Sequence, residues 1–149
     1  MNQFTLSALA FLGGIFLALQ GGLNAHLGVL LKNPLLASVI AFFSSFIFAV
    51  AIAIFSIDKL PPINQLKGVP PYLWFTGGLF SVIGISLYYY TIPKLGVSTM
   101  ISLGLCGQLI FAVIAGHYGW LNLPIEPITF KRLSGIIAMI AGILLINWK

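Results

Sequence analysis

Residues 17–28 read LALQGGLNAHLG, and they lie inside a run from Met1 to Leu31 that has no Asp, Glu, Lys or Arg. A membrane-spanning helix needs about 20 predominantly apolar residues, so this run is long enough to cross a bilayer with some tilt. Three polar side chains nevertheless stand within it, namely Gln20, Asn24 and His26. The predicted fold depends on whether lipid or water surrounds this run. The predicted function depends on what its three polar side chains face.

The composition indicates that lipid surrounds most of the chain. Of its 149 residues, 60% are hydrophobic and 6% are charged, and the mean hydropathy is +1.10. A soluble domain carries about 25% charged residues, and a chain this short cannot bury so much apolar surface in one core. A single cysteine excludes an internal disulfide. A net charge of +5 without an aromatic and basic stripe points to lipid headgroups rather than nucleic acid.

Five apolar runs are candidates for membrane spans. Backbone in lipid must satisfy its own hydrogen bonds, and no run alternates polar with apolar residues, so we expect helices rather than strands. The fold class predicted is therefore an all-α integral membrane protein, with one five-helix transmembrane domain over residues 1–149. The predicted spans are about 4–31, 35–57, 72–92, 96–116 and 131–148, with Asn33-Pro34 starting the second helix and Pro93 breaking the chain after the third.

Positive charge is nearly balanced between the two sides of the membrane. The side that holds the N-terminus receives Lys59, Lys67, Lys131 and Arg132, and the other side receives Lys32, Lys94 and Lys149. This bias leans toward a cytoplasmic N-terminus, and it is equally compatible with insertion in both orientations. Many transporters place their site between two inverted halves, so a single five-helix chain without an internal repeat is expected to need an oppositely oriented partner.

Gln20 and Asn24 are four residues apart and share one helix face, whereas His26 points elsewhere and lies nearer the membrane edge. Gly21 and Gly22 lie between the two amides, where they weaken the helix and let another backbone approach. Two interpretations remain open. The amides line a polar cavity, or they hydrogen-bond to neighbouring helices and only hold the bundle together.

Two further polar side chains are candidates for substrate contact. Gln108 is the one strongly polar residue at the centre of the fourth span, and the same two interpretations apply to it. The third span ends in three consecutive tyrosines, of which at most one or two can point inward. Tyr88 is the predicted inward residue, because it continues a stripe of small residues through Ser81 and Gly84. The predicted substrate-binding set is thus Gln20, Asn24, Gln108 and Tyr88.

The fifth span carries small residues on one face, Gly135, Ala138 and Gly142. This spacing favours close helix packing, either between two copies or within one bundle.

Several chemistries lack the residues that they need. The two acidic residues, Asp58 and Glu126, fall in predicted loops, so no carboxylate is available inside a span for a proton relay. The sequence has no phosphate-binding loop of the Walker type and no catalytic or metal-ligand motif. We therefore expect no enzyme activity, no cofactor and no metal.

The chain resembles the DUF606 (YdcZ-like) family of small membrane proteins in the drug/metabolite transporter (DMT) superfamily. The resemblance rests on QGGLNAHLG in the first span, YYYTIPKLGVSTMISLGLCGQLI across the third and fourth, HYGWLNLP after them, and RLSGIIAMIAGILLI at the end. It implies half of a ten-helix inverted-repeat transporter, located in the bacterial cytoplasmic (inner) membrane, that works as a homodimer or with a second five-helix paralogue. It also implies that Gln20, Asn24 and Gln108 are the matched polar residues, and it supplies no substrate.

The predicted function is secondary transport of a small organic metabolite by a dimer of oppositely oriented protomers. Amides offer donors and acceptors without fixed charge, which suits a neutral or zwitterionic small-molecule substrate. Two alternatives stay open: a channel inserted in both orientations, and a non-transporting membrane subunit of a larger assembly.

Overall fold

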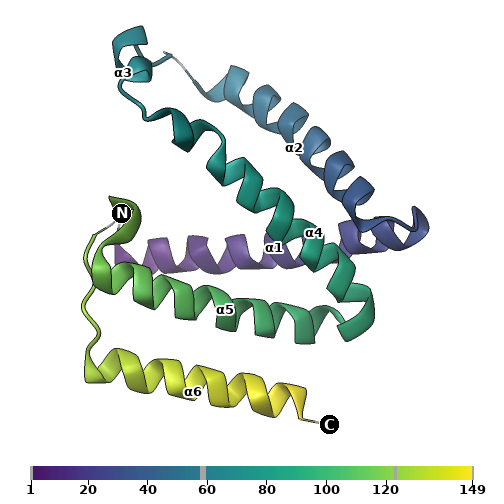
Figure 1. Cartoon of the computed structure of the whole chain (residues 1–149), viewed down its shortest axis with the longest axis vertical. Coiled ribbons are helices and arrows are strands. Elements are labelled where there is room, and N and C mark those ends of the chain that lie inside the picture. The colour runs from purple at the N-terminus through teal and green to yellow at the C-terminus, as the bar shows by residue number, and fades with distance from the viewer. Residues whose placement is uncertain (1, 58–59, 123, 149) are drawn as a thin grey trace. The chain divides into compact units, whose positions relative to one another are not determined.

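The computed structural model describes residues 2–57, 60–122 and 124–148, and within them the regular structure is entirely helical (Figure 1). Lys59 and Lys149, which entered the charge comparison, lie outside the described residues. The helices are α1 (Gln3–Leu30), α2 (Pro34–Ser56), α3 (Ile63–Lys67), η1 (Pro71–Trp74), α4 (Thr76–Leu95), α5 (Val97–Tyr118), η2 (Trp120–Asn122) and α6 (Phe130–Asn147).

Five helical segments are long and apolar enough to cross a membrane. Four of them are α1, α2, α5 and α6, and the remaining one, Pro71–Leu95, joins η1 to α4. Each segment corresponds to one predicted span. Their large apolar side chains point outward, as in Phe55 and Phe130, which are 89% and 88% exposed. This is the reverse of a water-soluble core and is what a lipid solvent requires, so the predicted fold class is confirmed.

A side-chain cap starts α2 where the sequence predicts it, and a further cap starts α6. The Asn33 side chain accepts a hydrogen bond from the Leu36 backbone N–H at 3.1 Å, and Pro34 is the first residue of α2. Thr129 caps α6 in the same way, by accepting from the backbone N–H of Arg132 at 3.3 Å.

One predicted boundary is wrong. The third span does not end at Ile92, because α4 continues through Pro93 to Leu95. A proline in the last turn removes a single backbone donor, which a helix near its end tolerates. The break falls instead at Gly96, whose φ of +84° is a conformation that glycine adopts without strain.

The chain forms two compact units, Met1–Lys94 and Leu95–Lys149. In the first, α1 packs closely on α2 through small residues: Ala25 and Ala37 are fully buried, and a Cβ at Gly28 would lie 3.4 Å from the Cα of Pro34. In the second, α5 packs on α6, with Ala115 and Ile143 buried. The prediction of one domain over 1–149 stays a prediction.

Candidate substrate-binding site

The first unit contains a polar cluster between α1 and α4. The Asn24 amide Nδ2 donates to the Tyr89 hydroxyl oxygen at 3.0 Å, and the Gln20 amide Nε2 donates to the same oxygen at 3.3 Å. Tyr89 is 1% exposed, whereas both amide residues are half-buried. Two side chains that the sequence predicts to share a face therefore converge on one buried hydroxyl.

Local sequence explains this convergence. The four-residue spacing puts both amides on the same face of α1, and the Ile92 side chain of α4 lies beside Gly21 between them. A Cβ at Gly21 would lie 3.5 Å from Cδ1 of Ile92, which is ordinary van der Waals contact. On α4, Tyr89 and Ile92 are three residues apart and both buried, so they form the face that meets α1.

The cluster lies within two of the candidate membrane-spanning helices, toward one end of each. Asn24 and Tyr89 each precede the last residue of their helix, Leu30 and Leu95, by six positions. At about 1.5 Å per residue, the cluster is about 9 Å from both helix ends. A hydrocarbon core is about 30 Å thick, so polar groups at this depth need partners.

The hydrogen bonds to Tyr89 use one N–H of each amide. An amide side chain also carries a carbonyl acceptor and a second N–H. Within the part of the chain that the structure describes, the side chains of Gln20 and Asn24 make no other hydrogen bond. The cluster can therefore offer donors and acceptors to a ligand, without a fixed charge.

The predicted assignment of Tyr88 is untested, and the tyrosine that contacts the amide pair is Tyr89. Tyr88 is half-buried, and Tyr90 is half-exposed with the Lys94 ammonium 3.3 Å from its ring centroid. The small-residue stripe favoured Tyr88, and no spacing within α4 distinguishes Tyr89 from its neighbours.

A second polar contact ties α4 to α2 in the same unit. The Ser86 hydroxyl donates to the Ser38 hydroxyl at 2.9 Å, and Ser38 donates to the Pro34 carbonyl at 3.1 Å. Ser38 is 1% exposed. The pair is one of several contacts that set how α4 is rotated about its axis, and neither serine was predicted as a site residue.

Gln108 lies on α5, in the other unit, and its membership of the substrate site stays a prediction. On α6, Asn147 Nδ2 donates to the Ser102 hydroxyl of α5 at 3.0 Å and, within α6 itself, to the Ile143 carbonyl at 2.8 Å. This contact of Asn147 between α5 and α6 was not predicted from the sequence.

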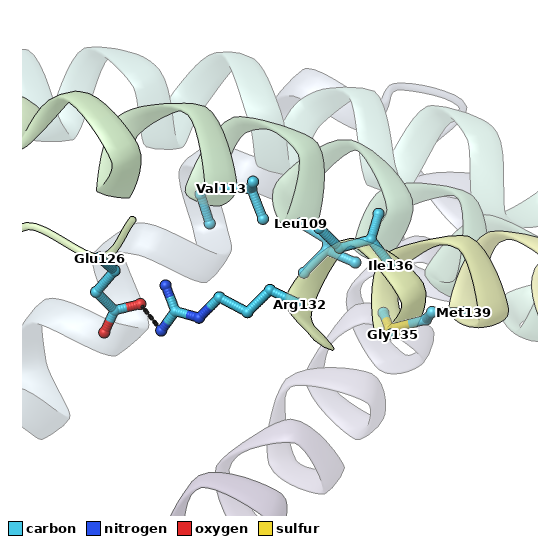
Figure 2. Close-up of a pocket in the computed structure, with 8 residues that line it drawn as sticks. Leu109, Val113, Glu126, Arg132, Gly135, Ile136 and Met139 are labelled. Atoms are coloured by element: carbon cyan, nitrogen blue, oxygen red, sulfur yellow. Dashed lines mark hydrogen bonds and ion pairs between the residues drawn. The ribbon is translucent and has the colours of Figure 1, made fainter. Parts of the chain in front are cut away.

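The second unit also holds a cavity of about 320 Å³ between α5 and α6 (Figure 2). Gly135 of the predicted packing face lines it, while a Cβ at Gly142 would meet nothing within 4 Å and Ala138 is exposed. Glu126 and Arg132 stand at one end of the cavity. Among the described residues, no group of three His, Cys, Asp or Glu side chains could hold a metal ion.

These features define a multi-pass integral membrane protein with five apolar helices long enough to span the membrane and an uncharged polar cluster between two of them. Residues 5–145 match the family DMT_YdcZ, described as "Putative inner membrane exporter, YdcZ". The chain belongs to this family, so it is a multi-pass inner membrane protein of a transporter family. Comparisons with curated proteins and with solved structures found no match.

Proposed function

We propose that the protein is a secondary transporter that exports a small neutral or zwitterionic organic solute, and that Gln20, Asn24 and Tyr89 bind this solute. The family description supports export across the inner membrane. The residue assignment rests on one observation: two amides of α1 share one buried hydroxyl of α4, on two candidate membrane-spanning helices. Gln108 and Tyr88 are proposed to line the same route.

A binding role explains why these groups are uncharged. Amide and phenol groups can exchange their mutual hydrogen bonds for bonds to a solute, and they require no counter-ion when the solute leaves. The two amides are half-buried and retain surface that a solute could contact. Access from alternate sides would follow from movement of one half of the transporter against the other around the site.

The second part of the proposal is a dimer of oppositely oriented protomers, formed by two copies or by this chain and a five-helix paralogue. The near balance of flanking positive charge supports it. For two copies, a cysteine at exposed Gln65, in a Cys106→Ala background, is expected to react with an impermeant thiol reagent from both sides of the membrane. Labelling from one side alone would contradict the opposite orientation of identical protomers.

Flux into liposomes tests the transport assignment. Purified protein is reconstituted and assayed with a panel of radiolabelled neutral amino acids and monosaccharides. Saturable uptake of at least one of them is expected, whereas a channel would give faster flux that does not saturate. Saturable flux of none of them would count against this class of solute.

Tyr89→Phe then tests whether this residue binds the solute, because the substitution removes only the hydroxyl group. We expect the half-saturation concentration to rise about fivefold to tenfold, because one hydrogen bond contributes about 1 kcal/mol. Tyr90→Phe is the matched control, since Tyr90 is exposed on the neighbouring position of α4 and is expected to leave uptake unchanged. Equal uptake by both variants would remove Tyr89 from the site.

A further inference from the structure

The cavity between α5 and α6 combines apolar walls with a pair of opposite charges at one end (Figure 2). Its volume of about 320 Å³ lies in the range of small-molecule sites. The apolar side chains that line it are Leu109, Ala112, Val113, Ile136 and Met139. The cavity is thus amphiphilic, unlike the uncharged cluster of the first unit.

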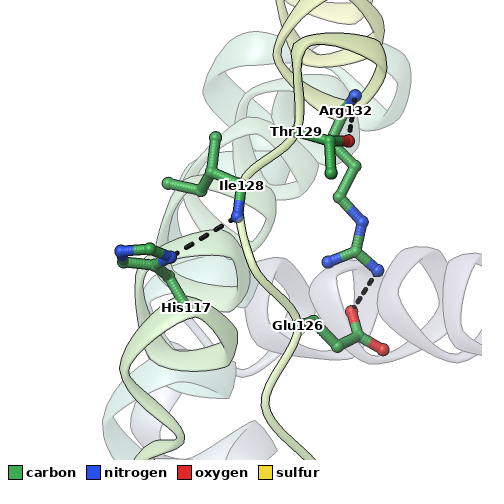
Figure 3. Close-up of polar contacts among 5 residues, drawn as sticks. All are labelled: His117, Glu126, Ile128, Thr129 and Arg132. Carbon is green, nitrogen blue, oxygen red and sulfur yellow. Dashed lines mark hydrogen bonds and ion pairs between the residues drawn. The ribbon is translucent and has the colours of Figure 1, made fainter.

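The charged end of the cavity is formed by Glu126, in the loop after α5, and Arg132, on α6. Arg132 Nη2 donates to Glu126 Oε2 at 2.7 Å, and both side chains are about half exposed. The backbone N–H of Glu126 donates to the Gly116 carbonyl at 2.8 Å, which holds the Glu126 backbone beside the end of α5 and leaves its side chain able to move. Figure 3 shows the same loop held at Ile128, whose N–H donates to His117 Nδ1 at 3.4 Å.

The cavity follows the two helices inward from this ion pair. Met139 is seven residues beyond Arg132 on α6, and Leu109 is seven residues before Gly116 on α5. Seven residues correspond to about 10 Å along a helix. The charges therefore lie near the helix ends, at the depth of lipid headgroups, and the apolar walls continue at the depth of acyl chains.

We propose that this cavity binds a phospholipid whose headgroup carries both a phosphate and a primary ammonium, as in phosphatidylethanolamine. Arg132 would donate to the phosphate with the N–H groups that Glu126 does not use, and the Glu126 carboxylate would accept from the ammonium. The lipid chain would lie along the walls formed by Val113, Ile136 and Met139.

Charge complementarity selects this lipid over others. Choline has no N–H to donate to Glu126, and the glycerol headgroup of an anionic lipid has no cation to offset that carboxylate. An exposed ion pair contributes little by itself, so Glu126 and Arg132 can separate to engage the two charges of a ligand. The inference concerns a lipid site and does not depend on the transport proposal.

Lipid retention by the purified full-length protein tests the proposal. Delipidated protein in detergent is mixed with equal amounts of phosphatidylethanolamine, phosphatidylcholine and phosphatidylglycerol, and bound lipid is counted by native mass spectrometry. We expect about tenfold preference for phosphatidylethanolamine, since a hydrogen bond to a charged group corresponds to about a factor of ten.

Variants separate the headgroup from the cavity. Glu126→Gln is expected to abolish the preference over phosphatidylcholine, and Arg132→Gln to reduce binding of all three lipids, while Lys131→Gln serves as the exposed cationic control. Ala112→Leu fills the cavity and should reduce all binding, whereas Ala141→Leu, on an exposed position outside the cavity, should not.

Three results would overturn the proposal. Equal retention of the three lipids would show nonspecific contact, and preference for phosphatidylglycerol would show a site for anionic lipid. Conversion of a dimer to a monomer by Ala112→Leu, without a change in bound lipid, would show that a second copy occupies the cavity.

Discussion

Replacing Tyr89 with phenylalanine removes one hydroxyl group and leaves the ring, so it tests the polar cluster without creating a large cavity. The hydroxyl accepts from Gln20 and Asn24, and both hydrogen bonds are lost. Interhelical hydrogen bonds in membrane proteins contribute about 0.6 kcal/mol on average and about 1.7 kcal/mol at most. Two such bonds predict a loss of about 1–3 kcal/mol in the free energy of unfolding.

Equilibrium unfolding by SDS in mixed micelles, followed by helical circular dichroism, measures this loss. A double-mutant cycle of Asn24→Ala with Tyr89→Phe isolates the shorter bond, and we expect a coupling energy of about 0.6 kcal/mol. Tyr90→Phe is the control, because Tyr90 is 50% exposed and the contact resolved for its ring is with Lys94 of its own helix, not with α1. A Tyr89→Phe variant as stable as the wild type, with zero coupling to Asn24, would refute the contact.

Three other substitutions follow from the packing. Ser38→Ala removes the acceptor of the Ser86 hydroxyl, so the same SDS assay should show a loss of about 0.5–1.5 kcal/mol, and no loss would contradict the contact. Gly119→Ala should lower the free energy of unfolding by about 1–3 kcal/mol. The reason is that Gly119 has a φ of +63° and a new Cβ would lie 2.8 Å from Cγ1 of Ile125. Unchanged stability would contradict that geometry. Gly142→Leu meets open space, so the stability of the monomer should be unchanged while cross-linking of dimers falls. Loss of the folded monomer would instead place Gly142 in contacts within one chain.

The helices were predictable because lipid imposes a simple rule on sequence. A span must be apolar for about 20 residues and must satisfy its backbone internally, and capping by Asn33 then marks where α2 begins. The end of α4 was not predictable from Pro93, because a proline disrupts a helix interior far more than a last turn. Gly96, with its positive φ, is the residue that ends the segment.

The candidate site was predictable in part. The pairing of Gln20 with Asn24 needs only the helical repeat, but the choice among Tyr88, Tyr89 and Tyr90 depends on how α4 is rotated about its axis. That rotation is fixed by contacts with distant residues, among them the hydrogen bond from Ser86 to Ser38. Sequence spacing within one helix carries no information about it.

The ion pair of the α5–α6 cavity was hidden for a related reason. Glu126 falls in an irregular segment, and its approach to Arg132 requires the loop to fold back on the end of α5. An acidic residue in a loop and an arginine beside a membrane span are common in membrane proteins. The sequence therefore does not indicate that Glu126 and Arg132 form a pair.

Access of water to the polar cluster tests the central claim most directly, and it needs no knowledge of the substrate. Asn24→Cys in a Cys106→Ala background is exposed to a membrane-impermeant thiol reagent in reconstituted vesicles. Leu23→Cys, on the adjacent and 72% exposed position of α1, is the control. Thiols react as thiolates, which do not form in hydrocarbon. A route for polar solutes predicts rapid labelling at residue 24 and little at residue 23; equally slow labelling at both would show that the amides only hold the helices together.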